Sequence, residues 1–215
     1  MIAEQLQQNK TGLRERNKQD KLHRIKSAAR ELFIEKGFDQ ATVRQISTRA
    51  GVAFGTVFRY ASNKRDLLFL IYNDELDELS DTAFLNIDPS LSFLDQLISI
   101  FRKFYQFFAE RPELARDVLR EMNFYEEGSQ ANRFKDGIRR IEIQMEDFVG
   151  ENRAQNRIST DADKRIIALL LFGVYRTEVR RWLSRSELDV DKGMERLRPY
   201  LEVVIAGLGP GKNAL

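Results

Sequence analysis

Cysteine is absent from the 215 residues, and histidine occurs once, as His23. The first absence excludes disulfides, thiolate zinc sites and a cysteine nucleophile, and the second disfavours histidine-rich metal sites and Ser–His–Asp catalysis. We therefore expect no metal, no cofactor and no catalytic residues. The chain has only 4 prolines and 12 glycines, which is typical of a mostly helical protein.

Long apolar runs are also missing. The longest run, at about residues 166–175, is shorter than the roughly 20 residues that a bilayer span requires. Residues 1–8 contain no hydrophobic stretch, so we expect no signal peptide. The sequence predicts a chain without membrane contact that acts in the cytoplasm.

Charge is distributed unevenly along the chain, although the net charge is only +2. Residues 1–65 hold 14 lysines and arginines against 6 acidic residues, whereas residues 66–215 hold 21 against 27. A basic N-terminal third ahead of an acidic remainder suggests a module that binds a polyanion. A solvated basic surface without a partner is the plainer alternative.

Helical periodicity organises the basic third. Apolar residues recur three or four positions apart over residues 20–36, and Gly37 follows as a natural helix-ending glycine. A second, short helix is expected from the N-cap residue Thr42 to the residue before Gly51, and a third over about residues 54–60. Two short helices around a glycine turn predict a helix-turn-helix, whose second helix fits the DNA major groove.

A known pattern recurs between residues 24 and 68. Its positions are Ala28, Ala29, Leu32, Phe33, Gly37, Phe38, Thr42, Val43, Ile46, Ala50, Gly51, Val52, Gly55, Thr56, Tyr60, Lys64, Leu67 and Leu68. In these positions the stretch, about a fifth of the chain, resembles the N-terminal signature of TetR/AcrR-family transcriptional regulators. The resemblance implies an all-α fold: an N-terminal three-helix helix-turn-helix DNA-binding domain over residues 1–65, and a C-terminal helical ligand-binding and dimerisation domain over residues 66–215.

The resemblance also implies which residues contact DNA, namely Thr42, Arg44, Gln45, Phe54, Gly55, Thr56, Arg59, Tyr60 and Lys64. Arg44 is the expected base reader, because its planar guanidinium matches the O6 and N7 atoms of guanine. Lys64 is expected to bind a flanking phosphate. Tyr60 fits packing and phosphate binding equally well, whereas Val57 and Phe58 are expected in the core.

The sequence departs from the family pattern at three positions. Ala53 stands where the family often has a serine or threonine that caps the recognition helix, Phe58 replaces a tyrosine, and Ala61 replaces a phenylalanine. Loss of the two hydroxyls is expected to weaken anchoring to DNA by about 0.5–1.5 kcal/mol per hydrogen bond. A basic arm offers compensation, with Lys10, Arg14, Arg16, Lys18 and Lys21. The arm either contacts the minor groove or the phosphates, or is a disordered tail.

The acidic two-thirds also follow a helical period. Aromatic residues between these helices, together with Met122, predict an effector pocket, with core packing as the alternative for each: Phe101, Phe104, Tyr105, Phe108, Met122, Tyr125, Phe148, Phe172 and Tyr175. The segment 166–175 is apolar nearly all round, as in a helix buried on two sides. By resemblance, the last two helices form a four-helix dimer interface through Ile167, Leu170, Leu171, Val174, Trp182, Leu201, Val204 and Ile205. A simple monomer core is the alternative.

Together these features predict a homodimeric, sequence-specific DNA-binding regulator, foremost a repressor that a small, largely apolar effector releases from a pseudo-palindromic operator. An activator and an effector-independent regulator are the alternatives within the family. Outside it, the alternative is a helical protein–protein adaptor with a basic surface. An enzyme is not expected, because the sequence has no phosphate-binding glycine loop or nucleophile elbow.

Overall fold

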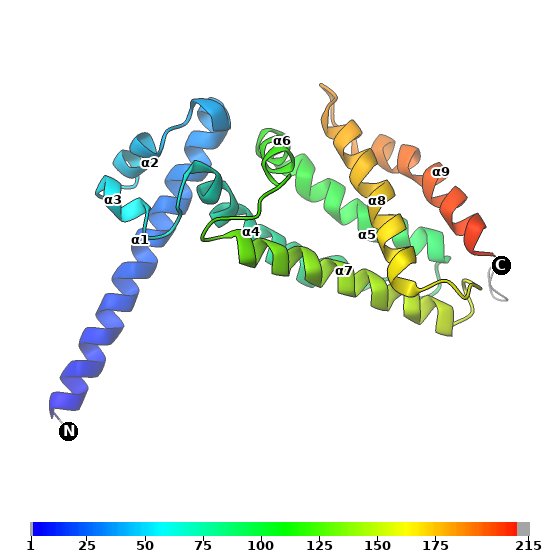
Figure 1. Ribbon diagram of the computed structural model, residues 1–215, viewed down its shortest axis with the longest axis horizontal. Coiled ribbons are helices and arrows are strands. Elements are labelled where there is room, and N and C mark those ends of the chain that lie inside the picture. Colours follow the sequence, from blue (N-terminus) through cyan, green and yellow to red (C-terminus); the bar gives the residue numbers. More distant parts are fainter. Residues whose placement is uncertain (1, 210–215) are drawn as a thin grey trace. The chain divides into compact units, whose positions relative to one another are not determined.

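The computed structural model describes the backbone of residues 2–209 and the side chains of residues 12–209. Within these limits the chain is all-α, as the sequence predicted. The helices are α1 (Ile2–Gln40), α2 (Val43–Arg49), α3 (Phe54–Val57), α4 (Lys64–Ala83), α5 (Phe93–Glu110), α6 (Pro112–Glu121), α7 (Ala131–Ala154), α8 (Lys164–Leu183) and α9 (Val190–Leu208), drawn in Figure 1. None of them, as far as the chain is described, has the length and apolar character to cross a bilayer.

The chain folds as two compact units. Unit 1 consists of the residues up to Asp74 together with Glu121–Asn132, and unit 2 consists of Glu75–Arg120 and the residues from Arg133 onward. Helix α4 therefore begins in unit 1 and ends in unit 2. Unit 1 is larger than the predicted domain of residues 1–65, because side chains of the first half of α4 bind the segment 121–132.

Unit 1 has its core beneath the helix-turn-helix. The apolar face predicted for residues 20–36 is buried here, and helix α1 packs with α2 (Figure 1). Gly37 breaks the regular helix as expected, since its φ of +78° lies in the region that favours glycine. Buried side chains of this core are Ile25, Ala29, Leu32, Phe33, Ile46, Val57, Leu67 and Leu68.

The start of α1 differs from the prediction. The helix begins at Ile2 rather than near residue 20, so the basic arm is helical and is not the disordered tail that the sequence also allowed. From residue 12 to residue 21 every side chain is exposed. The side chain of Lys10 lies outside the described residues.

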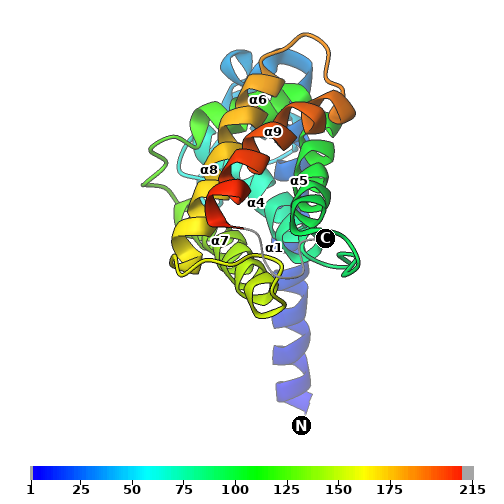
Figure 2. The ribbon, with the colours of Figure 1, turned by 90° about the vertical axis from the view of Figure 1, so that its right-hand side faces the viewer.

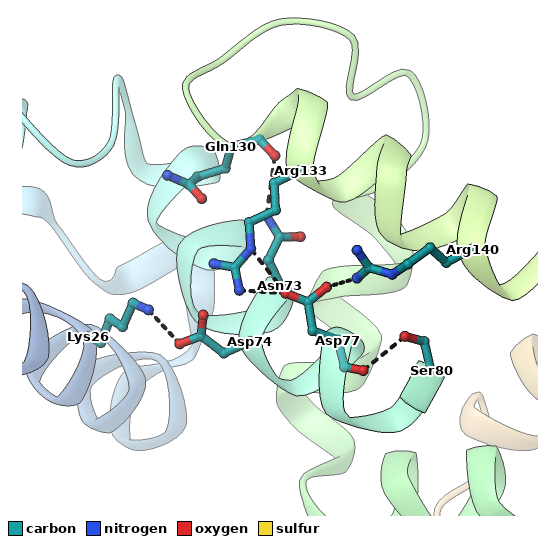
Figure 3. A network of polar contacts seen from close by, with 8 residues as sticks. All are labelled: Lys26, Asn73, Asp74, Asp77, Ser80, Gln130, Arg133 and Arg140. Atoms are coloured by element: carbon teal, nitrogen blue, oxygen red, sulfur yellow. Dashed lines mark hydrogen bonds and ion pairs between the residues drawn. The ribbon is translucent and has the colours of Figure 1, made fainter. Parts of the chain in front are cut away.

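Unit 2 packs α5 and α8 with α9, and Figure 2 shows these three helices running beside one another. Helix α5 buries one face, which the sequence predicted from its apolar period. Asp77 on α4 accepts hydrogen bonds from Arg133 and Arg140 on α7, with 2.6 Å between Asp77 Oδ2 and Arg133 Nη2 (Figure 3). These ion pairs fix α7 along the second half of α4.

Candidate nucleic-acid interface

The helix-turn-helix is shaped by local hydrogen bonds. Thr42 and Gln45 form a capping box at the start of α2: Thr42 Oγ1 accepts from Gln45 N at 3.2 Å, and Gln45 Oε1 accepts from Thr42 N at 3.1 Å. At the other end Gly51 has a φ of +62°, and Val52 N donates to Ser47 O at 3.0 Å. This Schellman closure satisfies the carbonyls of the last turn and directs the chain into α3.

Arg24 holds the turn against α1. Its Nη1 donates to Ala50 O at 3.1 Å, and its Nε lies 3.1 Å from a carboxylate oxygen of Asp20. A Cβ on Gly51 would lie 3.3 Å from Arg24 Nη1, so the guanidinium fits closely over the glycine. The sequence placed Arg24 on the polar face of the first helix but gave no sign of this role, which needs a contact 26 residues away.

An exposed face combines aromatic and cationic groups. The Phe54 and Phe58 rings are 46% and 44% exposed and meet edge to face, with their centroids 5.1 Å apart. The Arg44 guanidinium lies 5.6 Å from the centre of the Phe54 ring. Arg59 is also exposed. The prediction that Phe58 belongs to the core was wrong, because Phe58 follows the exposed Phe54 by four positions and shares its outward face.

Space is free around the backbone at Gly55, on this exposed face. A Cβ at this position would have no heavy atom within 4 Å, so no neighbour within the described chain requires the glycine. Ala53 precedes α3 without a side-chain cap, as the sequence indicated. The first amide groups of α3 are therefore not satisfied by a capping side chain.

Four of the expected DNA contacts, Thr42, Gln45, Tyr60 and Lys64, are engaged inside unit 1. Lys64 Nζ donates to Phe38 O at 2.7 Å and to Asp39 O at 3.0 Å, and it lies 4.5 Å above the centre of the Phe38 ring. The Tyr60 hydroxyl donates to Lys18 O at 3.2 Å. The side chains of Thr42 and Gln45 are both engaged in the capping box. Lys64 therefore ties the start of α4 to the end of α1.

A buried carboxylate joins the segment 125–130 to the start of α4. Asp66 is fully buried, and its Oδ2 accepts from Ser62 N and Ser129 N, both at 2.8 Å, and from Ser129 Oγ at 2.7 Å. Its Oδ1 accepts from Gln130 N at 3.2 Å and from the Tyr125 hydroxyl. Burial alone would raise the pKa of Asp66, but these donors outweigh it and lower the pKa to about 2.

Neighbouring side chains reinforce this attachment. Arg65 donates from Nε to Glu121 O at 2.8 Å and from Nη2 to Asn123 O at 2.7 Å. Asn73 Nδ2 donates to Gln130 O at 3.2 Å, as Figure 3 shows. Burial, together with the hydrogen bond to Asp66, raises the pKa of Tyr125, so its hydroxyl remains a donor at neutral pH. The link between α6 and α7 is thus part of unit 1.

The residues predicted to line an effector pocket, eight aromatic residues and Met122, fall into separate groups. A cluster in unit 2 is packed ring against ring; within it the Phe101 and Tyr175 rings stack with their centroids 4.7 Å apart. Its members are Phe101, Phe104, Tyr105, Phe172 and Tyr175. Phe108 is buried in unit 2, and Phe148 stacks on Phe93 with 5.5 Å between the centroids. Met122 and Tyr125 belong to unit 1, so the nine residues do not line one pocket within a single unit.

The residues predicted for the dimer interface also divide. Half of them are buried in the core of this chain and are not free to contact a second subunit: Ile167, Leu171, Trp182 and Leu201. Leu170 is 53% exposed, and Val174, Val204 and Ile205 are half-buried. The predicted interface did not include the other exposed apolar residues on α8 and α9, namely Ile166, Leu169, Tyr200 and Val203. In a helix that is apolar all round, periodicity alone does not distinguish the face that is buried in its own chain from the face that is exposed.

Comparisons with known proteins agree with this architecture. Residues 25–71 match the family "Bacterial regulatory proteins, tetR family". The fatty acid metabolism regulator protein of Bacillus subtilis (strain 168) is 25% identical over 175 residues, which are 80% of this chain and 88% of the relative. The HTH-type transcriptional regulator HbdR of an Aromatoleum species is 39% identical, over 27% of this chain and 26% of that protein.

Solved structures show the same fold. The regulator FadR of Bacillus subtilis in complex with stearoyl-CoA has a TM-score of 0.68 and 21% identity, and the match covers 86% of this chain and 98% of that one. The repressor FadR of Thermus thermophilus in complex with lauroyl-CoA has a TM-score of 0.66 and 20% identity, over 87% and 94%. The family resemblance predicted from the sequence is confirmed, and the relatives are transcriptional regulators rather than enzymes.

Proposed function

We propose that this chain, which is a transcriptional regulator of the tetR family, is a homodimeric repressor that leaves a pseudo-palindromic operator when a small, largely apolar effector binds. It would act in the cytoplasm. The observation that supports operator recognition most directly is the exposed face of Arg44, Phe54 and Arg59, which lies within the matched residues 25–71. An arginine fork can read guanine, and an exposed ring can pack on thymine methyl groups.

The exposed face of α8 and α9 supports the dimer. Ile166, Leu169 and Leu170 are each about half exposed on α8, and Val203 on α9 is 75% exposed. A Cβ on Gly173, one turn further along α8, would meet no heavy atom within 4 Å, so this surface admits close approach of another backbone. Several exposed apolar side chains on neighbouring helices are typical of an interface. A two-fold dimer would present two recognition segments to successive turns of the duplex.

An apolar effector is supported by two observations. The aromatic cluster of unit 2 provides an apolar interior between α5 and α8. Two similar folds were solved with fatty acyl-CoA thioesters, stearoyl-CoA and lauroyl-CoA. We therefore propose a fatty acyl thioester as the first effector class to test. Release from the operator then follows from mass action. An effector that binds the conformation unable to bind DNA more tightly than the DNA-binding conformation lowers the affinity for DNA by the ratio of its two affinities.

Selection from a random duplex library at moderate salt tests operator recognition. We expect the purified protein to enrich an inverted repeat, and Arg44→Ala to lose sequence preference while it keeps binding to random DNA. A matched control is Arg16→Ala, because Arg16 is exposed but lies outside the helix-turn-helix. If Arg44→Ala weakened specific and random DNA equally, Arg44 would not be a base reader.

Titration of the protein–operator complex with lauroyl-CoA and stearoyl-CoA tests the effector class. We expect loss of the complex at concentrations below those at which free coenzyme A acts, since the acyl chain supplies the apolar contact. Equal potency of free coenzyme A and the acyl thioesters would exclude a fatty acyl effector. In the selection experiment, a protein that retains DNA only at low salt and enriches no repeat would instead favour the alternative of an adaptor with a basic surface.

A further inference from the structure

A groove runs between the exposed part of α1 and the recognition segment, which is α3 with the residues that follow it up to Tyr60. It encloses about 450 Å³, and its lining comes from two parts of unit 1: Arg14, Glu15, Asn17, Lys18 and Lys21 on α1, and Thr56, Arg59 and Tyr60 on the segment around α3. The Tyr60 hydroxyl donates to Lys18 O at 3.2 Å and so fixes the register of the two walls. This groove shares Arg59 with the exposed face of Arg44, Phe54 and Arg59, whereas Arg44 and Phe54 do not line it.

The groove is strongly cationic. Four side chains in its lining are basic and one, Glu15, is acidic. The ion pair between Lys18 Nζ and Glu15 Oε1 is long, at 3.8 Å, and both side chains are more than half exposed. In the described part of the chain, Arg14, Lys21 and Arg59 have no ion pair. These cations are therefore available to an external anion.

The spacing of the cations on α1 suits a linear polyanion. Arg14, Lys18 and Lys21 are separated by four and three positions, which places them on one face of a helix. From Arg14 to Lys21 the helix rises by about 10 Å, close to the rise of three nucleotides along one DNA strand. Arg16 stands two positions from Arg14 and does not line the groove.

We propose that the N-terminal part of α1 is a second DNA contact, in which this groove receives the phosphodiester backbone that flanks the operator, bound by Arg14, Lys18 and Lys21 together with Arg59. The inference rests on the proposed operator binding. The recognition segment supplies one wall of the groove, so a duplex seated on Arg44 and Phe54 brings its nearest phosphates to the groove. The helical arm thereby offsets the hydroxyls that this chain lacks at Ala53 and Phe58.

The salt dependence of DNA binding tests the inference. A phosphate contact contributes about 0.9 to the slope of log K against log salt concentration, so each lost contact weakens binding about eightfold at 0.1 M salt. We expect Lys18→Ala and Lys21→Ala each to lower the slope by about one and to weaken operator and random DNA alike. Arg16→Ala is the matched control, since it removes one positive charge from the same helix outside the groove.

The outcomes separate this inference from the function on which it depends. If the unaltered protein enriches no repeat, the proposed function fails and the second contact fails with it. If it binds an operator but Lys18→Ala and Lys21→Ala keep its slope, or Arg16→Ala lowers the slope as much as they do, only the groove contact is overturned. Far-UV circular dichroism of each variant checks that α1 remains helical, as exposed alanine substitutions predict.

Discussion

Replacement of Asp66 by asparagine is expected to destabilise unit 1 strongly. The carboxylate accepts from Ser62, Ser129, Gln130 and Tyr125 while fully buried. Its pKa falls from 3.8 to about 2 in the folded chain, which corresponds to about 2 kcal/mol of stabilisation of the charged form. An asparagine also turns two donor hydrogens toward groups that are themselves donors. We therefore expect Asp66→Asn to lower the free energy of unfolding by about 2–4 kcal/mol at pH 7.

The stabilisation by Asp66 depends on pH. Because the folded pKa is lowered, the stabilisation by Asp66 is complete above about pH 5 and is lost as the pH falls from about 4 through 2. Urea unfolding, followed by circular dichroism at pH 7, 5, 4 and 3, should show the difference between the two proteins shrinking only in the acid range. A difference that stays constant down to pH 3 would refute the assignment of the low pKa to Asp66.

A second substitution perturbs the same contact from the other side. Gly128 has a φ of +139°, and a Cβ there would lie 2.3 Å from Asp66 Oδ1. Gly128→Ala should therefore destabilise unit 1 while the carboxylate itself remains. If Gly128→Ala were as stable as the unaltered protein, the segment 125–130 would not be seated on Asp66 as described.

The remaining predictions concern packing, an internal lysine and the dimer. Gly193→Ala should cost about 1–3 kcal/mol in urea unfolding, since its Cβ would lie 2.7 Å from a ring carbon of buried Tyr105; an unchanged midpoint would contradict this packing. Lys64→Met should lower the free energy of unfolding by about 1–2 kcal/mol. It should leave the dependence of DNA affinity on salt concentration unchanged, because the ammonium is engaged by the carbonyls of α1. A weaker salt dependence would show that Lys64 contacts a phosphate after all. Leu170→Glu should yield monomers in sedimentation velocity, whereas Ser184→Glu, at the exposed C-cap of α8, should not; monomers from both would point to unfolding.

The sequence predicted elements whose signals are local. Gly37 and Gly51 stand where the backbone adopts positive φ, and the apolar period of residues 20–36 marks a face that is buried. Contacts between distant residues left no such signal. Arg24 reaches the turn after α2, and Asp66 binds residues 125–130, because the fold brings together positions 26 and about 60 residues apart. A helix that is apolar on every side, as over residues 166–175, likewise does not reveal which side its own chain covers.

The Asp66 contact bears on how an effector could act on DNA. Residues 121–132 connect α6 to α7, whose remaining residues lie in unit 2, and yet this segment belongs to unit 1. The segment that joins α6 to α7 is therefore held in unit 1 by Arg65, Asp66 and Asn73. The same segment bonds to the recognition region, since Ser129 Oγ and Gln130 Nε2 each donate to Tyr60 O at 3.2 Å. An effector that displaced α6 or α7 would therefore act on hydrogen bonds that are costly to break, rather than on a loosely held loop.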